Sequence, residues 1–314
     1  MNIVLKVNKE VQDKMIEYYT PKKRDKQIPY VLLQADDNDT VITMYTSGKV
    51  MFQGVSADVD AMMWQEMMGV SKEEKKKKEE QNQKYHDCNS VGSDEVGTGD
   101  YFGPIVVTAS YVTRGDVKFL EELGVCDSKK INDEKILKIA PQIAKRVKYR
   151  SLILSNLEYN TKYTKDINMN KIKSIMHNKV LYQLVHEEQP EYDYIIVDEF
   201  AREARYYGYL TGISDVQRDI TFMTKAEDKN LAVACSSIIS RYIFLKEFDK
   251  LSDSLGIPLV KGAGSEVDKI GEEVVEKFAP TAKAWAEKYG EEKLKEIAKL
   301  NFANTKRILH TMIF

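Results

Sequence analysis

The segment SKEEKKKKEEQNQK at residues 71–84 constrains the fold most, because it contains no apolar residue. Such a stretch can bury no surface in a hydrophobic core, so the chain has to build separate cores on either side of it. We expect a solvated helix or a flexible linker here, acting as a solubilising spacer rather than as a basic recognition tail. The length of 314 residues, at roughly 150 residues per domain, agrees with two domains, at 1–70 and 85–314.

The composition excludes several classes of protein. With 47 Lys and Arg against 49 Asp and Glu, the chain cannot bind nucleic acid by bulk positive charge, although a local basic patch would suffice. No run of about 18 uncharged apolar residues predicts a membrane span, and the first residues lack the apolar core of a signal peptide. The three dispersed cysteines (Cys88, Cys126 and Cys235) predict free thiols in a reducing compartment, and therefore a cytoplasmic protein.

The first domain reads as a small α+β unit. A short strand at 3–7 is followed by a helix that Pro21 ends, and a second helix is expected at 60–68. Between them lie three strands joined by tight turns, at 30–35, 40–46 and 49–54. Helices would cover one face of this sheet and leave the other face open.

Strand alternation predicts which side chains occupy the open face. The positions that could face solvent are Thr43, Tyr45, Lys49 and Gln53. A polar and aromatic sheet face of this kind is a plausible platform for a nucleic-acid backbone, with Tyr45 and Lys49 as candidate contacts. The alternative is an ordinary solvated sheet face.

The second domain reads as α/β. A strand runs into Asp94, and after a glycine-rich turn a second strand covers 105–112. Helices and strands then alternate, with helices at 128–147, 170–188 and 230–256 and strands at 151–157 and 192–200. Antiparallel strands followed by this alternation predict a mixed sheet flanked by helices.

Three pairs of acids could carry chemistry. Asp94 and Glu95 precede the glycine-rich turn, Asp198 and Glu199 end the apolar strand YIIVDEF, and Glu227 and Asp228 precede the long helix. Ligands of α/β sheets bind beyond the carboxyl ends of the strands, which is where the first two pairs fall. Taken singly, each acid could instead be a strand terminus in water or a helix cap.

Taken together, the acids predict a divalent metal site. Clustered carboxylates repel one another and need a compensating cation, and no cysteine pair or close histidine pair supports zinc. Carboxylate oxygens suit Mg²⁺ or Mn²⁺. Two such ions about 4 Å apart can clamp the attacking and leaving oxygens of a phosphodiester cleavage.

The loop GTGDYFGP at 97–104 is a second signal, because its glycines let the backbone approach a ligand closely. Its spacing is GxGxxxG and a strand follows it, so it is not a dinucleotide-binding fingerprint, and GxxxxGK[ST] is absent. No nucleotide cofactor is expected. Three nearby cations could hold phosphates or merely balance charge: Lys129, Lys130 and Lys225.

The segment GSDEVGTGDYFGP, together with DSKK at 127–130, resembles the type 2 ribonuclease H family, in its ribonuclease HIII form. Further blocks agree in order, and SGKVMFQG at 47–54 looks like that family's N-terminal extension. These blocks are VDEF at 197–200, TKAEDKNLAVACSSIISRY at 224–242, LVKGAGSEVD at 259–268 and NFANT at 301–305. The resemblance therefore covers nearly the whole chain.

The resemblance implies a ribonuclease H fold for 85–314 and a TATA-binding-protein-like domain for about 1–70. It implies an endonuclease that cleaves the RNA strand of RNA/DNA hybrids with two Mg²⁺ or Mn²⁺ ions, leaving 5′-phosphate and 3′-hydroxyl ends. We expect a monomer without a membrane partner.

The resemblance also assigns residues. Asp94, Glu95 and Asp198 would be metal-binding catalytic acids, and the KAE pattern at 225–227 selects Glu227 as the fourth, with Asp228 as the alternative. The loop residues Gly97, Thr98 and Gly99 resemble those that read the ribose 2′-hydroxyl. Ribonuclease HII carries Gly-Arg-Gly there, so Gly-Thr-Gly favours ribonuclease HIII and predicts inefficient incision at a single embedded ribonucleotide.

Two other functions remain open at this point. One is a different metal-dependent nuclease of the same fold, such as a resolvase of branched DNA, which would not need 2′-hydroxyls. The other is a non-catalytic hybrid-binding protein, against which the complete set of acids argues.

Overall fold

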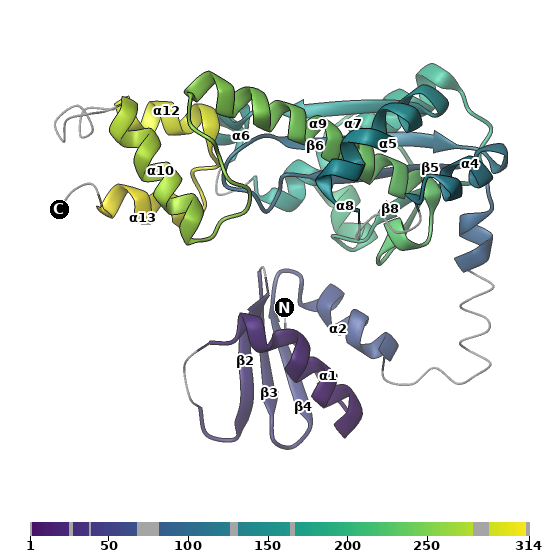
Figure 1. Cartoon of the computed structure of the whole chain (residues 1–314). Coiled ribbons are helices and arrows are strands. Elements are labelled where there is room, and N and C mark those ends of the chain that lie inside the picture. Colours follow the sequence, from purple (N-terminus) through teal and green to yellow (C-terminus); the bar gives the residue numbers. More distant parts are fainter. Residues whose placement is uncertain are drawn as a thin grey trace. The chain divides into compact units, whose positions relative to one another are not determined.

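The computed structural model describes residues 2–24, 28–37, 39–67, 82–125, 131–163, 167–278 and 289–311 (Figure 1). It forms two compact units, one comprising Met1–Lys84 with Glu199–Arg205 and the other Tyr85–Asp198 with Tyr206–Phe314. Most of the expected linker at 71–84 lies outside the described residues, as do Cys126, Lys129 and Lys130.

The first unit is built on a four-stranded antiparallel sheet with the order β1-β4-β3-β2. Helix α1 starts where the Asn8 side chain accepts a hydrogen bond from the Val11 amide at 2.9 Å, and it ends just before Pro21. The elements are β1 (Asn2–Lys6), α1 (Lys9–Tyr19), β2 (Val31–Asp37), β3 (Thr40–Tyr45), β4 (Lys49–Gly54) and α2 (Ala57–Met67).

One face of this sheet carries the core of the unit. Ile42 and Phe52 are fully buried and share one apolar cluster with Met15 and Tyr19 of α1 and Trp64 of α2. Inside the cluster the indole N–H of Trp64 donates to the Tyr19 hydroxyl at 2.8 Å, which satisfies a buried donor. The prediction that both helices cover one face is confirmed.

The other sheet face carries the predicted solvent-facing positions, with one exception. Lys49 is exposed and Tyr45 and Gln53 are half-buried, but Thr43 is buried, so its predicted exposure is wrong. Thr43 lies between longer neighbours in the sheet register, and the Gln34 side chain reaches over to donate a 3.0 Å hydrogen bond to its hydroxyl. A short side chain between long ones is covered even on an open face.

The second unit is built on a five-stranded mixed sheet with the order β7-β6-β5-β8-β9. Strands β5 (Ser90–Val96), β6 (Ile105–Val112) and β7 (Lys148–Leu154) are antiparallel, whereas β8 (Tyr194–Asp198) and β9 (Ile220–Met223) run parallel to β5. The mixed sheet is as predicted, but β9 was not expected from the sequence.

Helices cover both faces of this sheet. Helix α9 (Leu231–Leu255) and helix α7 (Met169–Glu188) both pack on β5 and β6. They lie on opposite faces, because Gly92 meets α9 and the next residue, Ser93, meets α7. A Cβ on Gly92 would lie 2.5 Å from the Val233 amide nitrogen, so only glycine permits this approach.

The remaining helices complete the unit. The C-terminal helices gather at the end of the unit that also holds α6 (Figure 1). In the part of the chain that the structure describes, no helix has the length and apolarity to cross a membrane. These helices are α4 (Val117–Glu122), α5 (Asp133–Arg146), α6 (Asn156–Lys162), α10 (Ser265–Phe278), α12 (Tyr289–Ile297) and α13 (Ala303–Thr311), and α8 (Glu203–Tyr209) is divided between the two units.

Several element boundaries differ from the prediction, among them the start of α2 at Ala57 and the span of β8 at Tyr194–Asp198. Two of the differences have clear local reasons. The helix expected from residue 128 begins at Asp133, because the Asn132 side chain accepts a hydrogen bond from the Lys135 amide. The strand expected at 151–157 ends at Leu154, because Ser155 and Glu158 form a reciprocal cap that starts α6.

Candidate active site

The sheet brings Asp94 and Asp198 side by side. Strands β5 and β8 pair in parallel with Ser93 opposite Val197, so the next residue of each strand, Asp94 and Asp198, lies level with the other. Neighbouring strands are about 4.8 Å apart. Two carboxylates from distant parts of the sequence therefore share the carboxyl end of this sheet, as the strand-end argument predicts.

Asp94 is held from the α9 side of the sheet. Its carboxylate accepts hydrogen bonds from the Ser237 hydroxyl and, at 2.9 Å, from the Glu95 amide, while Ser240 donates to its carbonyl oxygen at 3.2 Å. Burial, followed by the charges of Glu95 and Asp198, raises the pKa of Asp94 well above the usual range. An acid placed in this way is costly to ionise without a cation.

Asp198 is fixed by the turn that precedes α9. The Ala226 amide donates to its Oδ1 atom at 2.9 Å, within a 3₁₀ turn over Ala226–Asp228 that follows Lys225 in a left-handed conformation (φ 54°). Burial, with the charges of Glu227 and Glu95, raises the pKa of Asp198 to about 6. The charge of Glu227 is thus one cause of the raised pKa of Asp198, and the neighbouring Asp228 is exposed.

Glu95 points toward α7, on the opposite face of β5 from Asp94. Its Oε1 atom lies 2.5 Å from the Lys173 ammonium, and its Oε2 atom lies 2.8 Å from Nε2 of His177, whose other ring nitrogen contacts the Ser93 hydroxyl at 2.8 Å. Against the effect of burial, the charges and hydrogen bonds of Lys173 and His177 lower the pKa of Glu95. Glu95 is therefore an ionised, firmly oriented acid.

Lys173 and His177 were missed by the sequence reasoning. They lie one helical turn apart on α7, and this i, i+4 spacing within the helix predicted at 170–188 was the available signal. The sequence does not reveal which acid such a pair contacts, because that depends on the side of the sheet on which the helix packs.

The acids fit a hard divalent cation. Asp94 and Asp198 each carry a raised pKa caused partly by other members of the set, so uncompensated negative charge is concentrated at one place. Among the described residues, no group of three or more acidic, histidine or cysteine side chains is arranged so that it could hold a metal ion by itself. Mg²⁺ and Mn²⁺ do not require one, because they retain waters and take substrate phosphates as further ligands.

Asp198→Asn is expected to stabilise the metal-free protein by about 1–3 kcal/mol near neutral pH. The pKa of Asp198 is raised to about 6 in the fold, so ionisation destabilises the folded state as the pH rises from about 4 to 6. Asparagine removes that penalty and can still accept the Ala226 hydrogen bond. The melting temperature in EDTA should rise by several degrees at pH 7.5 and by less at pH 5.

A matched control is Asp193→Asn, just before the opposite end of β8, where Asp193 pairs with Arg114 at the surface. This change should not raise the melting temperature. An equal gain for both variants, or a gain for Asp198→Asn that does not depend on pH, would contradict the repulsion argument.

The loop at 97–104 joins β5 to β6 beside these acids. Gly97 has a φ of 95°, and a Cβ there would lie 2.1 Å from the Pro104 carbonyl oxygen, so the turn requires glycine. Gly99 has open space around it and Thr98 is half-buried, which leaves their backbone groups near the surface. Lys225 is exposed at the turn next to Ala226.

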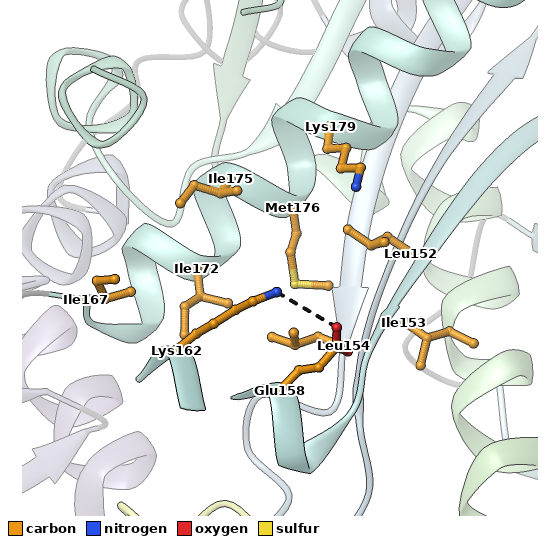
Figure 2. Close-up of a pocket in the computed structure, with 10 residues that line it drawn as sticks. All are labelled: Leu152, Ile153, Leu154, Glu158, Lys162, Ile167, Ile172, Ile175, Met176 and Lys179. Carbon is orange, nitrogen blue, oxygen red and sulfur yellow. Dashed lines mark ion pairs between the residues drawn. The ribbon is translucent and has the colours of Figure 1, made fainter. Parts of the chain in front are cut away.

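Four other predicted site residues belong to the first unit or lie outside the described residues. Tyr45 and Lys49 belong to the first unit, and Lys129 and Lys130 lie outside the described residues. A separate pocket of about 240 Å³ lies between β7, α6 and α7, with apolar walls and the Glu158–Lys162 ion pair at 3.9 Å (Figure 2). None of its ten lining residues is a predicted site residue.

Known proteins match the chain over nearly its whole length. The family model described as Ribonuclease HII matches residues 91–305, and a model described as a domain of unknown function (DUF3378) matches residues 2–80. Proteins named Ribonuclease HIII from Lysinibacillus sphaericus and Bacillus anthracis are 38% and 39% identical to this chain. Those alignments cover 98% of this chain in both cases, and 98% and 97% of the relatives.

Solved structures agree with the sequence matches. The crystal structure of Bst-RNase HIII in complex with Mn²⁺ superposes with a TM-score of 0.68 at 36% identity and covers 99% of both chains. Aquifex aeolicus RNase H3, at 22% identity and a TM-score of 0.54, covers 96% of this chain and 100% of its own, and shares the fold. The predicted fold class, a ribonuclease H-like mixed sheet with a small N-terminal sheet domain, is confirmed. Matches of this extent and identity show that the chain belongs to the ribonuclease HIII group of the type 2 ribonuclease H enzymes.

Proposed function

We propose that this enzyme hydrolyses the RNA strand of RNA/DNA hybrids by metal-dependent phosphodiester cleavage, leaving 5′-phosphate and 3′-hydroxyl ends. The observation that carries the proposal is the level placement of Asp94 and Asp198 on neighbouring strands, with Glu227 acting on Asp198. The names of the relatives, and the Mn²⁺ bound to one of them, support the same reaction class.

Asp94, Glu95, Asp198 and Glu227 would hold Mg²⁺ or Mn²⁺. When bound, two such ions would activate a water molecule and stabilise the leaving 3′ oxygen. The protein's own part is orientation: Ser237 and the Ala226 amide hold Asp94 and Asp198, and Lys173 with His177 holds Glu95. Fixed ligands reduce the rearrangement that is needed when substrate arrives.

Selection of RNA is proposed to reside in the backbone of Gly97, Thr98 and Gly99. A ribose 2′-hydroxyl both donates and accepts a hydrogen bond, so a backbone amide and carbonyl can together recognise it. The openness around Gly99 supports a close approach of the sugar. Lys225, together with Lys129 and Lys130, would contact phosphates, and a single embedded ribonucleotide should be a poor substrate.

The N-terminal domain, at 1–70, is proposed to hold the hybrid through its open sheet face, with 71–84 as linker and 85–314 as catalytic domain. Exposed Lys49 and half-buried Tyr45 would contact the sugar-phosphate backbone, which supplies affinity without sequence choice. The working enzyme would be a monomer.

Lys49→Glu is expected to raise KM for hybrid by about 3–10-fold, because it replaces an attractive charge by a repulsive one at one proposed phosphate contact. The value of kcat should stay within about twofold of the wild-type value. Lys14→Glu is the matched control, since Lys14 lies on α1, which packs on the opposite sheet face, and pairs there with Glu10 at 2.7 Å. Steady-state kinetics at two salt concentrations measure both effects. Equal KM values for the two variants would remove this face from the substrate-binding surface.

A substrate panel tests the proposed function. Labelled RNA/DNA hybrid, DNA/DNA duplex, branched DNA and a duplex with one ribonucleotide are each incubated with Mg²⁺, Mn²⁺ or EDTA. The proposal expects metal-dependent cleavage of the hybrid, weak cleavage at the single ribonucleotide and none of the all-DNA substrates. Cleavage of branched DNA would indicate a resolvase, and hybrid binding without products would indicate a non-catalytic protein.

A further inference from the structure

The far end of the glycine loop is held by a C-terminal segment of the chain. The Gly103 amide donates to the Ile297 carbonyl at 3.1 Å, Phe102 forms an antiparallel bridge with Ala298, and the Lys299 amide donates to the Tyr101 carbonyl at 2.9 Å. The loop therefore pairs with residues about 200 positions later in the sequence. Backbone pairing of this kind fixes the path of residues 101–103.

Lys299 adds a second connection through its side chain. Its ammonium donates to the carbonyl oxygens of Asp100, at 2.7 Å, and Gly103, at 2.6 Å. The side chain is 0% exposed, and burial lowers its pKa to about 7. Lysine is almost never fully buried without a specific partner, because removing an ammonium from water is costly. Here the partners are two carbonyl groups of one loop.

Two further segments, which also belong to the sequence blocks named above, form hydrogen bonds with the same loop. Neither segment supplies an acid to the candidate site. From the block at 259–268, Gly262 accepts a hydrogen bond from the Tyr101 amide at 2.8 Å and donates to the Asp100 carboxylate at 2.6 Å. From the block at 301–305, Thr305 contacts the Tyr101 hydroxyl at 3.1 Å. Both blocks thus converge on the same loop residues that Lys299 holds.

Holding residues 100–103 also restricts residues 97–99, because the loop is short and both of its ends continue into strands. The loop leaves β5 after Val96 and enters β6 at Ile105, and Gly97 packs so closely on the Pro104 carbonyl oxygen that no Cβ would fit between them. With 100–103 also fixed, residues 97–99 have little freedom left. Recognition of one hydroxyl group needs donors and acceptors held within about 0.5 Å, which a free glycine loop does not provide.

We propose that Lys299 is a positioning residue that holds loop 97–103 in the shape that distinguishes ribose from deoxyribose. The inference rests on the proposed function, since it concerns how the same loop selects its substrate. Lys299 touches neither the acids nor the sugar in this account; it acts through the carbonyls of Asp100 and Gly103.

The test compares Lys299→Met, which keeps the apolar stem of the side chain but lacks the terminal ammonium and its donors, with Asn160→Ala. Asn160 of α6 holds the same C-terminal segment. Its amide donates to the carbonyls of Ala298 and Lys295 at 2.8 and 2.9 Å, and its oxygen accepts from the Leu300 amide at 3.0 Å. Both variants are assayed on labelled hybrid in Mn²⁺, with unlabelled DNA/DNA duplex of the same sequence as competitor. The readouts are kcat, KM for hybrid and Ki for the DNA duplex.

Lys299→Met should lower the ratio of Ki for the DNA duplex to KM for hybrid by about tenfold, and it should lower kcat by at least tenfold. Asn160→Ala, assayed at a temperature below its melting temperature, should keep this ratio and kcat within twofold of the wild-type values. Should Lys299→Met not fold, Lys299→Gln, with a shorter side chain that retains an amide donor, carries the test and should show a smaller loss of the ratio. An unchanged ratio in the folded Lys299 variant, or an equal loss in Asn160→Ala, would overturn the inference. Failure of the wild-type enzyme to cleave hybrid would instead defeat the proposed function.

Discussion

Asp94→Asn should lower the rate of hybrid cleavage in Mn²⁺ by about 1,000-fold or more while leaving the fold intact. Charge stabilisation by a bound divalent ion contributes several kcal/mol to the barrier, and about 4 kcal/mol corresponds to a factor of 1,000. Asparagine keeps the size of the side chain and one oxygen to accept the Ser237 hydrogen bond, but it loses the charge that holds the ion. Asp198→Asn should behave in the same way for the same reason.

The measurement is single-turnover cleavage of labelled hybrid, with circular dichroism to confirm folding. Asp193→Asn serves again as the control, because it removes a carboxylate near β8 that lies at the opposite end of the strand and pairs with Arg114. A surface pair of this kind contributes about 0–1 kcal/mol, so this variant should cleave at close to the wild-type rate. Turnover by Asp94→Asn at a near-normal rate would remove Asp94 from the site.

Glu227→Gln should lower the cleavage rate by about 100-fold or more, whereas Asp228→Asn should stay within about threefold of wild type. The charge of Glu227 helps to raise the pKa of Asp198 to about 6, so the two carboxylates share one environment. Asp228 is its neighbour in the same 3₁₀ turn and is exposed, so a change there leaves the charge near Asp198 unaltered.

Glu227→Gln and Asp228→Asn are closely matched variants, because the two residues are adjacent in one turn and carry the same charge. Both variants lose one carboxylate, and both leave the Ala226 hydrogen bond to Asp198 in place. The reverse pattern, with Asp228→Asn inactive and Glu227→Gln active, would transfer the fourth acid to Asp228. Rates measured over a range of Mn²⁺ concentrations would also separate weaker ion binding from a slower chemical step.

The strands and helices that carry the acids could be predicted from local pattern. The short run YIIVDEF predicts a buried strand, and Asp198 then lies at its carboxyl end. The rule that ligands bind at such ends predicts from the sequence alone that Asp94 and Asp198 contribute to one site. Helix α9 was predicted to within one residue at each end, because Asn230 caps its start and Gly256 ends it.

The contacts of the site could not be predicted, because they depend on long-range packing. Strand alternation sends Asp94 and Glu95 to opposite faces, but only the position of α7 decides that Glu95 meets Lys173 and His177. Lys299 looks in the sequence like any surface lysine, and only the fold buries it against Asp100 and Gly103. Strand β9 is only four residues long and carries no turn signal strong enough to mark it.

The most direct test of the central claim maps the products of one labelled RNA/DNA hybrid, with wild type and Asp94→Asn, in Mn²⁺ and in EDTA. We predict that wild type with Mn²⁺ cuts only the RNA strand and leaves 5′-phosphate and 3′-hydroxyl ends, and that the other three combinations leave the hybrid intact. Cleavage in EDTA, cleavage of the DNA strand, or full activity of Asp94→Asn would contradict it.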